Sequence, residues 1–164
     1  MGGGCIHPLS SVVTTAGHKF AQDVRPGDEI AMPTGTAKVL SSWTTILGGR
    51  HWYEINNSLV ITHDHPVKLQ SGWGVIDVNA YATERHNQFF TCKTLSGMMQ
   101  VRCYFGELPT FKALEVGDVL VDGTVVTSIT EHNNHSMYPT INFLTDTPTF
   151  IADGIEVANI GVAE

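Results

Sequence analysis

The sequence has few charged residues, few cysteines and no long hydrophobic run. Charged residues make up 15% of its 164 residues, and the formal net charge is −7. No cluster of Lys and Arg is longer than a dipeptide, so we expect no nucleic-acid partner. No apolar stretch reaches the roughly 18 residues of a membrane span. The opening Met-Gly-Gly-Gly lacks the basic and apolar regions of a secretory signal, so we expect neither a membrane nor a secretory destination.

The three cysteines are Cys5, Cys92 and Cys103. Their number is odd and no Cys-x-x-Cys pair occurs, so we expect neither a disulfide framework nor a zinc ribbon, and no metal or other cofactor. Cys92 and Cys103 fall in two predicted strands, where we expect small buried residues. Cys5 follows three glycines, ahead of the first predicted strand, where a role in the core is hardest to assign. Thiols outside disulfides favour a reducing location, in the cytoplasm or within a virion.

The pattern of short strands predicts an all-β fold in one domain. Runs rich in Val, Ile, Thr and aromatic residues recur along the chain and are separated by Gly, Pro, Asn and Asp. Only Asp77–Arg85 has the composition of a short helical turn. The predicted strands are Ser11–Thr15, Ala37–Leu40, Leu59–Thr62, Gly74–Val78, Phe89–Leu95, Met99–Phe105, Val119–Val121, Thr124–Thr130 and Phe150–Ala152.

A weak internal repeat divides the chain into two similar halves. Three segments of the first half recur in the same order in the second, at an offset that falls gradually. Each half is too short to enclose its own core, so we expect two β-rich halves to interlock around a pseudo-twofold axis. The matched pairs are Phe20–Ile30 with Phe111–Leu120, Tyr53–Asn57 with Tyr138–Asn142, and Thr62–Pro66 with Thr145–Pro148.

Cys5, together with Thr62-x-x-His65, forms a candidate catalytic constellation. A thiol at the start of a domain can attack the carbonyl of Gly4 and convert the Gly4–Cys5 amide into a thioester. The departing amide nitrogen needs a proton, and histidine is a suitable acid because its pKa lies near neutrality. The hydroxyl of Thr62 can orient the bond or support the oxyanion. A glycine before the cysteine adds little steric obstruction.

These residues belong to three ordered blocks that resemble the Hint superfamily, which comprises inteins, hedgehog processing domains and bacterial intein-like domains. The resemblance covers residues 5–159, at the spacing of an intein without an endonuclease insert. It implies a horseshoe-shaped β-fold with an internal pseudo-twofold axis, an upstream flank over residues 1–4 and a downstream flank over residues 160–164. The blocks are Cys5 with Val12–Gly17 and Asp23–Ile30, Leu59–Val67 with Gly72-Trp73, and Phe150–Asn159.

The C-terminal block departs from the family pattern. The resemblance makes Asn159 the residue that would cyclise and break the chain after itself. Its family helpers are missing, because Ala158 stands where a histidine usually assists and Ile160 offers no hydroxyl or thiol to accept an acyl group. The family's second histidine of this block is also missing, and Thr147 and Thr149 stand in its neighbourhood. The Asp that the family often has upstream is replaced by Thr140 or a residue beside it.

We therefore predict autocatalytic cleavage at Gly4–Cys5 in a single turnover, with Cys5, Thr62, His65 and Asn159 as candidate catalytic residues. The expected partners are the chain's own flanking segments and an external nucleophile (water, a thiol or an amine), and we expect a monomer. The glycine-rich flank resembles the setting of such domains in phage structural proteins. Full splicing lacks its acceptor and takes second place.

Two other interpretations stay open. A degenerate, non-catalytic Hint domain would serve as a structural module of a larger, viral protein. A zinc-dependent hydrolase would use His63 and His65 as ligands, although the Asp-His pair and the βα alternation of such enzymes are absent. We expect His63 to face solvent and Asp64 to form the turn before Pro66.

Overall fold

The computed structural model describes residues 4–80, 88–94, 97–103 and 111–159, and most of them lie in or between short β-strands, with one 3₁₀ turn. The predicted all-β class is confirmed. The elements are β1 (Ser11–Thr14), β2 (Gly17–Phe20), η1 (Ala21–Asp23), β3 (Glu29–Ala31), β4 (Thr36–Ile46), β5 (Trp52–Ile55), β6 (Leu59–Thr62), β7 (Val67–Leu69), β8 (Gly72–Val75), β9 (Gln88–Thr94), β10 (Gly97–Cys103), β11 (Phe111–Ala113), β12 (Ile129–His132), β13 (Pro139–Thr145), β14 (Thr149–Ala152) and β15 (Ile155–Ala158).

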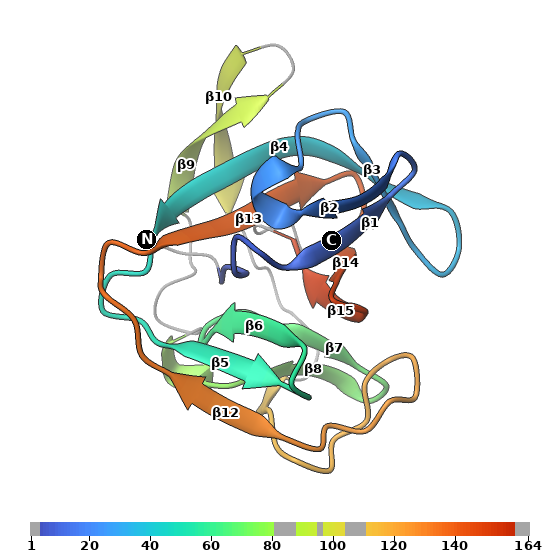
Figure 1. Cartoon of the computed structure of the whole chain (residues 1–164), viewed down its shortest axis with the longest axis vertical. Helices are drawn as coiled ribbons and strands as arrows, with labels where there is room; N and C mark the ends of the chain where they lie inside the picture. The colour runs from blue at the N-terminus through green and yellow to red at the C-terminus, as the bar shows by residue number, and fades with distance from the viewer. Residues whose placement is uncertain (1–3, 81–87, 95–96, 104–110, 160–164) are drawn as a thin grey trace.

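The strands of the described residues form three sheets around a central segment. The largest has the order β10-β9-β4-β3-β1-β2, with β13 also paired to β4. The second has the order β11-β8-β7-β15-β14, and the third has the order β12-β5-β6. Figure 1 shows the largest sheet on one side and β5–β8 with β12 on the other, while β14 and β15 lie between them.

The segment that begins at Gly4 runs between these two sides. Ile6 forms one β-bridge with Ile141 of β13 and another with Ile61 of β6. Its amide donates to the Ile141 carbonyl at 2.7 Å, and the Ile141 amide donates back at 3.0 Å. The N-terminal segment therefore joins the two sides of the fold and carries Cys5 into its interior.

Two turns confirm the internal repeat at the level of hydrogen bonds. In each turn a glycine adopts a left-handed conformation, with φ of 96° in the first half and 100° in the second. The following aspartate accepts the backbone N–H three residues before it and pairs with a lysine. The residues are Lys19, Arg25, Gly27 and Asp28 in the first half and Lys112, Glu115, Gly117 and Asp118 in the second.

The two halves also exchange strands. β4 of the first half pairs with β13 of the second, while β12 of the second half pairs with β5 of the first. Both pairings are antiparallel. β4 and β12 occupy equivalent places in the two halves, as do β5 and β13, so each pairing joins a strand of one half to the strand that follows its equivalent in the other half. This reciprocal exchange is the structural form of the predicted pseudo-twofold axis, and it explains why neither half encloses a core alone.

Several predicted strand boundaries are wrong. The prediction at Ala37–Leu40 is too short, since β4 continues to Ile46. Most of Thr124–Thr130 is not a strand, because its backbone folds back on residues 117–120: Gly117 N–H donates to Val126 O, and Leu120 N–H donates to Thr124 O, both at 2.8 Å. Val119–Val121 likewise contributes isolated bridges only.

The predictions that reach uncertain segments are tested in part. Residues 78–80 are helical, and Asp77 accepts the Ala80 amide at 2.9 Å, while residues 81–85 of the predicted turn lie outside the described residues. The side chains of Cys92 and Cys103, the flank residues 1–3 and the flank 160–164 also lie outside the described part. Among the residues that the structure describes, no helix is long and apolar enough to cross a membrane.

Cys5 lies in the core of the fold, where the sequence gives it no evident role. Cys5 is fully buried, although a role in the core was the hardest to assign to it from the sequence. The reason is the pairing of its neighbour Ile6 with both β6 and β13, which no local pattern around residue 5 indicates.

Candidate active site

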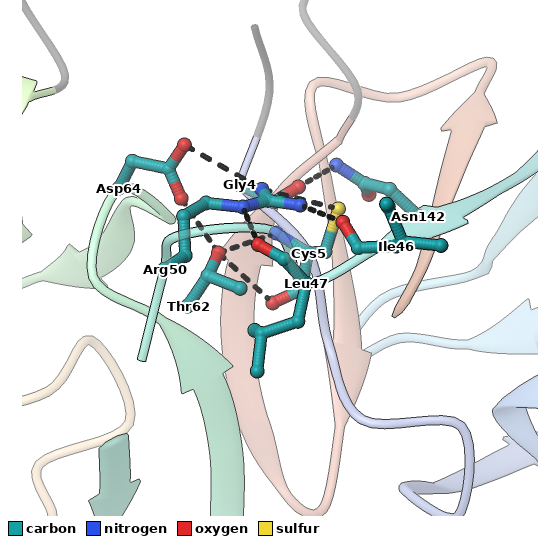
Figure 2. Close-up of polar contacts among 8 residues, drawn as sticks. All are labelled: Gly4, Cys5, Ile46, Leu47, Arg50, Thr62, Asp64 and Asn142. Carbon is teal, nitrogen blue, oxygen red and sulfur yellow. Dashed lines mark hydrogen bonds and ion pairs between the residues drawn. The ribbon is translucent and has the colours of Figure 1, made fainter. Parts of the chain in front are cut away.

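The Gly4–Cys5 peptide group is buried and hydrogen-bonded at both of its polar atoms. The Cys5 amide donates to Thr62 Oγ1 at 2.9 Å. The Gly4 carbonyl oxygen accepts Asn142 Nδ2–H at 2.5 Å. Figure 2 shows the two contacts reaching the peptide from opposite sides, Thr62 from β6 and Asn142 from β13. One peptide bond is thereby oriented by two strands from different halves of the fold.

The orientation of the Asn142 amide is fixed from both ends. Its Oδ1 accepts the backbone N–H of Phe143 at 2.8 Å, and a backbone N–H can only donate. Its Nδ2 must therefore face the Gly4 carbonyl. Thr140 lies two residues earlier on β13, on the same face of the strand, and both side chains are fully buried beside the N-terminal segment.

Thr62 is held by a buried carboxylate. Its Oγ1 lies 2.6 Å from Asp64 Oδ1 and 3.4 Å from the Cys5 carbonyl oxygen, and the shorter contact takes the single hydroxyl proton. Donating to Asp64 leaves the Thr62 oxygen able to accept the Cys5 amide. Asp64 does lie in the turn after β6, as predicted, but its full burial and its bond to Thr62 give it a further role that the sequence did not indicate.

A guanidinium group lies beside the Cys5 thiol. Arg50 Nη1 is 3.8 Å from Cys5 Sγ and 3.7 Å from Asp64 Oδ2. Burial is the strongest influence on the thiol and raises its pKa, while the charge of Arg50 and the hydroxyl of Thr140 lower that pKa and the Asp64 carboxylate raises it. The net direction is upward, so Cys5 is a protonated thiol at rest near neutral pH.

His65 touches both ends of the domain. A methyl group built on Gly4 would lie 2.1 Å from His65 Cα and 2.3 Å from its Cβ, so the Gly4 backbone packs directly onto this residue. On the other side of its ring, His65 Nε2 lies 2.9 Å from the Ala158 carbonyl oxygen. Because a carbonyl only accepts, Nε2 carries a hydrogen.

Asn159 lies at the end of β15 with its side chain turned to the preceding loop. Its Nδ2 donates to the Thr147 carbonyl at 2.8 Å, and its backbone N–H donates to the Pro148 carbonyl at 3.1 Å. The Asn159 side chain is therefore bonded to the main chain of Thr147, one of the two threonines in the neighbourhood of the missing C-terminal histidine. The structure brings Cys5, Thr62 and His65 together around one peptide bond, and His65 connects this group to the residue before Asn159.

The arrangement does not resemble a metal centre. His65 is buried against Gly4 and Ala158, whereas His63 is half-buried beyond the end of β6, so the two proposed zinc ligands are held in different surroundings. Within residues 4–80, 88–94, 97–103 and 111–159, no group of three or more His, Cys, Asp and Glu side chains is placed to hold a metal ion.

The sequence did not predict Arg50, Asn142 or the charge role of Asp64. Arg50 follows two glycines in a turn, a setting typical of a solvated residue. Asn142 stands between Ile141 and Phe143 in an apolar strand, and a buried amide in such a strand requires a partner. That requirement was the one available signal for Asn142.

Comparisons with known proteins agree on one fold. No family model matches the sequence, and no curated protein matches it by sequence. Solved structures do match. The gp41-1 intein has a TM-score of 0.57 at 16% identity, with 96% of this chain and 99% of that chain covered. The zinc-bound splicing domain of the Msm DnaB1 intein has a TM-score of 0.61 at 15% identity, with 94% and 99% covered. The bacterial intein-like domain from Clostridium thermocellum has a TM-score of 0.56 at 16% identity, with 97% and 99% covered.

The coverage is nearly complete in both directions, so this chain and these domains have the same extent as well as similar architecture. The reciprocal strand exchange, the paired turns and the shared architecture lead to one conclusion: the chain has the Hint fold of inteins and bacterial intein-like domains, at the size of a mini-intein.

Proposed function

We propose that this chain is a self-processing domain that cleaves its own backbone at the Gly4–Cys5 bond through an N-to-S acyl shift. The proposal rests on the hydrogen bonds that hold this one peptide group. Its N–H is bound by Thr62, its carbonyl by Asn142, and both are buried beside a cysteine thiol. A structural peptide needs such bonds too, but the nucleophile at the same residue and the fold shared with inteins favour chemistry.

The proposed reaction is an isomerisation. Cys5 Sγ attacks the Gly4 carbonyl carbon and forms a C–S bond, while the carbonyl electron pair moves onto oxygen. Asn142 Nδ2–H stabilises the resulting oxyanion. Collapse of the adduct breaks the C–N bond, and the nitrogen takes a proton to become the α-amine of Cys5. The thiol loses one proton and the amine gains one, so no net proton is consumed.

His65 is suited to transfer that proton. His65 Nε2–H donates to Ala158 O, and in the neutral form of the ring this tautomer leaves the lone pair on Nδ1. Nδ1 is bonded to Cγ, the ring atom on the side that packs against Gly4. In the proposed mechanism Nδ1 accepts the thiol proton and returns it to the departing nitrogen. Thr62 accepts the amide N–H in the resting state and so holds the nitrogen in place.

The thioester is then resolved by water, a thiol or an amine, which releases the upstream segment. Transfer to a downstream residue lacks an acceptor because Ile160 has neither hydroxyl nor thiol. Cyclisation of Asn159 requires its Nδ2 to leave the Thr147 carbonyl and attack the Asn159 carbonyl. We therefore propose N-terminal cleavage as the reaction and splicing as the second candidate.

The test is a fusion of a reporter protein to the full chain at its N-terminus, incubated with dithiothreitol and followed by denaturing electrophoresis and mass spectrometry. The expected product is the reporter ending at Gly4, carried as a thioester of dithiothreitol or as the free acid. Cys5→Ala abolishes release, while Cys92→Ala and Cys103→Ala serve as matched controls that still cleave.

Each other outcome contradicts part of the proposal. A chain that gives the circular dichroism spectrum of a β-sheet protein but releases nothing at any pH would be a structural module. A second product cut after Asn159, formed at a comparable rate, would establish the splicing-type reaction at the C-terminal end.

A further inference from the structure

The loop between β4 and β5 holds a cation against the Cys5 sulfur. Arg50 Nε donates to the Leu47 carbonyl at 3.1 Å, and Nη2 donates to the Ile46 carbonyl at 2.9 Å. The turn is closed by the Arg50 amide on the same Leu47 carbonyl at 3.2 Å, and Gly48 adopts a left-handed φ of 64° within it. Figure 2 shows the guanidinium fixed by these carbonyls, with its remaining edge toward Cys5.

The Cys5 thiol and a carboxylate share one nitrogen of this guanidinium. The two carbonyls at the end of β4 are neutral, and the Asp64 carboxylate oxygen Oδ2 is 3.7 Å from Nη1. Cys5 Sγ is at nearly the same distance, 3.8 Å, from that same nitrogen. Only 11% of the Arg50 side chain is exposed, so solvent screens the cation weakly. An arginine stays protonated throughout the accessible pH range.

We propose that Arg50 is a catalytic residue of the acyl shift: its preorganised guanidinium stabilises the Cys5 thiolate and so determines how the rate of sulfur attack depends on pH. The expected effect of Arg50 on cleavage rests on the proposed function. Its effect on the ionisation of Cys5 does not, because that effect comes from the direct contact with the thiol. The charged and titratable groups that face the thiol or its peptide among the described residues are Arg50, Asp64 and His65.

The balance of charges explains why a cation is needed. Burial opposes ionisation of Cys5, and Asp64 opposes it further. Arg50 counters both, and it also forms an ion pair with Asp64 Oδ2, while Asp64 Oδ1 accepts the Thr62 hydroxyl. One guanidinium thus supports the nucleophile directly and the orientation of the amide nitrogen through Asp64 and Thr62.

The direct test is a titration of Cys5 in the full chain labelled with ¹³Cβ-cysteine, followed by NMR and assigned with Cys5→Ala. Arg50→Met keeps a long apolar stem and removes the charge, so the ionisation midpoint rises by about one pH unit or more. Arg50→Lys retains the charge and changes the midpoint less. Arg25→Met is the matched control, because Arg25 bonds to the carbonyls of Gln22 and Val24.

A second variant keeps the test valid if Arg50→Met does not fold. Asp64→Asn removes the neighbouring anion, so the same midpoint moves in the opposite direction, downward. A midpoint that stays unchanged in both variants would overturn the inference.

The cleavage rate provides the second measurement. Below the midpoint, Arg50→Met slows cleavage by only about three- to fourfold for each pH unit by which the midpoint rises, because a more basic thiolate is also a better nucleophile. The deficit shrinks as the pH approaches the midpoint. A deficit that stays the same on both sides of the midpoint would assign Arg50 a purely structural role. If no form cleaves but the midpoint moves as stated, the proposed function fails while the role of Arg50 in thiolate stabilisation stands.

Discussion

Removing the amide of Asn142 is the sharpest test of the proposed chemistry. In the oxyanion the negative charge develops on the Gly4 oxygen, which already accepts Asn142 Nδ2–H at 2.5 Å. Loss of one oxyanion donor in an acyl-transfer site costs about 10²–10³-fold in rate, or about 2.7–4 kcal/mol. We expect that loss for Asn142→Ala.

The same substitution also affects stability, and the assay must separate the two effects. Asn142→Ala leaves the Phe143 N–H and the Gly4 carbonyl unpaired in the interior, each at about 1–3 kcal/mol. The oxyanion argument therefore predicts that Asn142→Ala loses more cleavage rate than a control variant with a comparable loss of stability.

The measurement is the first-order rate of reporter release in dithiothreitol, with the free energy of unfolding taken from urea denaturation of the same proteins. Phe143→Leu is the matched control. Phe143 points to the opposite face of β13 and packs edge-to-face on Phe150, with the ring centroids 5.2 Å apart. We expect it to lose about 1–2 kcal/mol of stability and less than tenfold in rate. If Asn142→Ala and Phe143→Leu slow cleavage equally at equal loss of stability, the oxyanion role is refuted.

Three further predictions concern the surroundings of the same bond and the repeated turns. Gly4→Ala lowers the rate of reporter release at least tenfold, because the added methyl meets the backbone and Cβ atoms of His65. Since His65→Ala keeps those atoms, the double variant does not regain the rate, and gel densitometry of the fusions measures both. Thr62→Val removes the acceptor of the Cys5 amide and lowers the cleavage rate at least tenfold, whereas Thr62→Ser restores most of it; equal rates for the two would contradict this role. Burial raises the pKa of Asp118, but the bonds from Lys112 and from the Glu115 amide outweigh burial and lower that pKa. The carboxylate therefore stabilises the fold above its unfolded pKa near 4, and this contribution is lost as the pH falls below that value. Thermal melts of Asp118→Asn should show less acid destabilisation than the unaltered chain.

The sequence predicted the class of fold because β-structure leaves local marks. Turn residues and alternating apolar residues report each strand separately, and the repeated Gly-Asp turns report the duplication because a left-handed glycine and a backbone-binding aspartate are both needed there. The strand exchange leaves no local mark. Pairing β4 with β13 joins residues about a hundred positions apart, and register over such a separation is set by the whole core.

The same distinction separates the predicted part of the site from the rest. Cys5, Thr62 and His65 stand in sequence blocks, and the structure places them around one bond. The proposed roles of Asn142 and Arg50 depend on position alone, because their contacts with Gly4 and Cys5 form only when the N-terminal segment is inserted between β6 and β13. A single sequence cannot show that insertion, because Ile6 pairs with strands 55 and 135 residues away (Ile61 and Ile141).

The two ends of the domain differ in whether their contacts come from side-chain or main-chain atoms. At the C-terminal end, the contact that orients His65 is the backbone carbonyl of Ala158, and any residue at position 158 supplies a carbonyl. The missing histidine side chain there removes a group that Asn159 would need, while leaving the tautomer and the position of His65 intact. Asn159 meanwhile anchors β15 by its bonds to Thr147 and Pro148, and so keeps that carbonyl in place. In the proposed mechanism the C-terminal reaction can therefore be lost without loss of the N-terminal one, because β15 contributes to the proposed N-terminal site through its main chain.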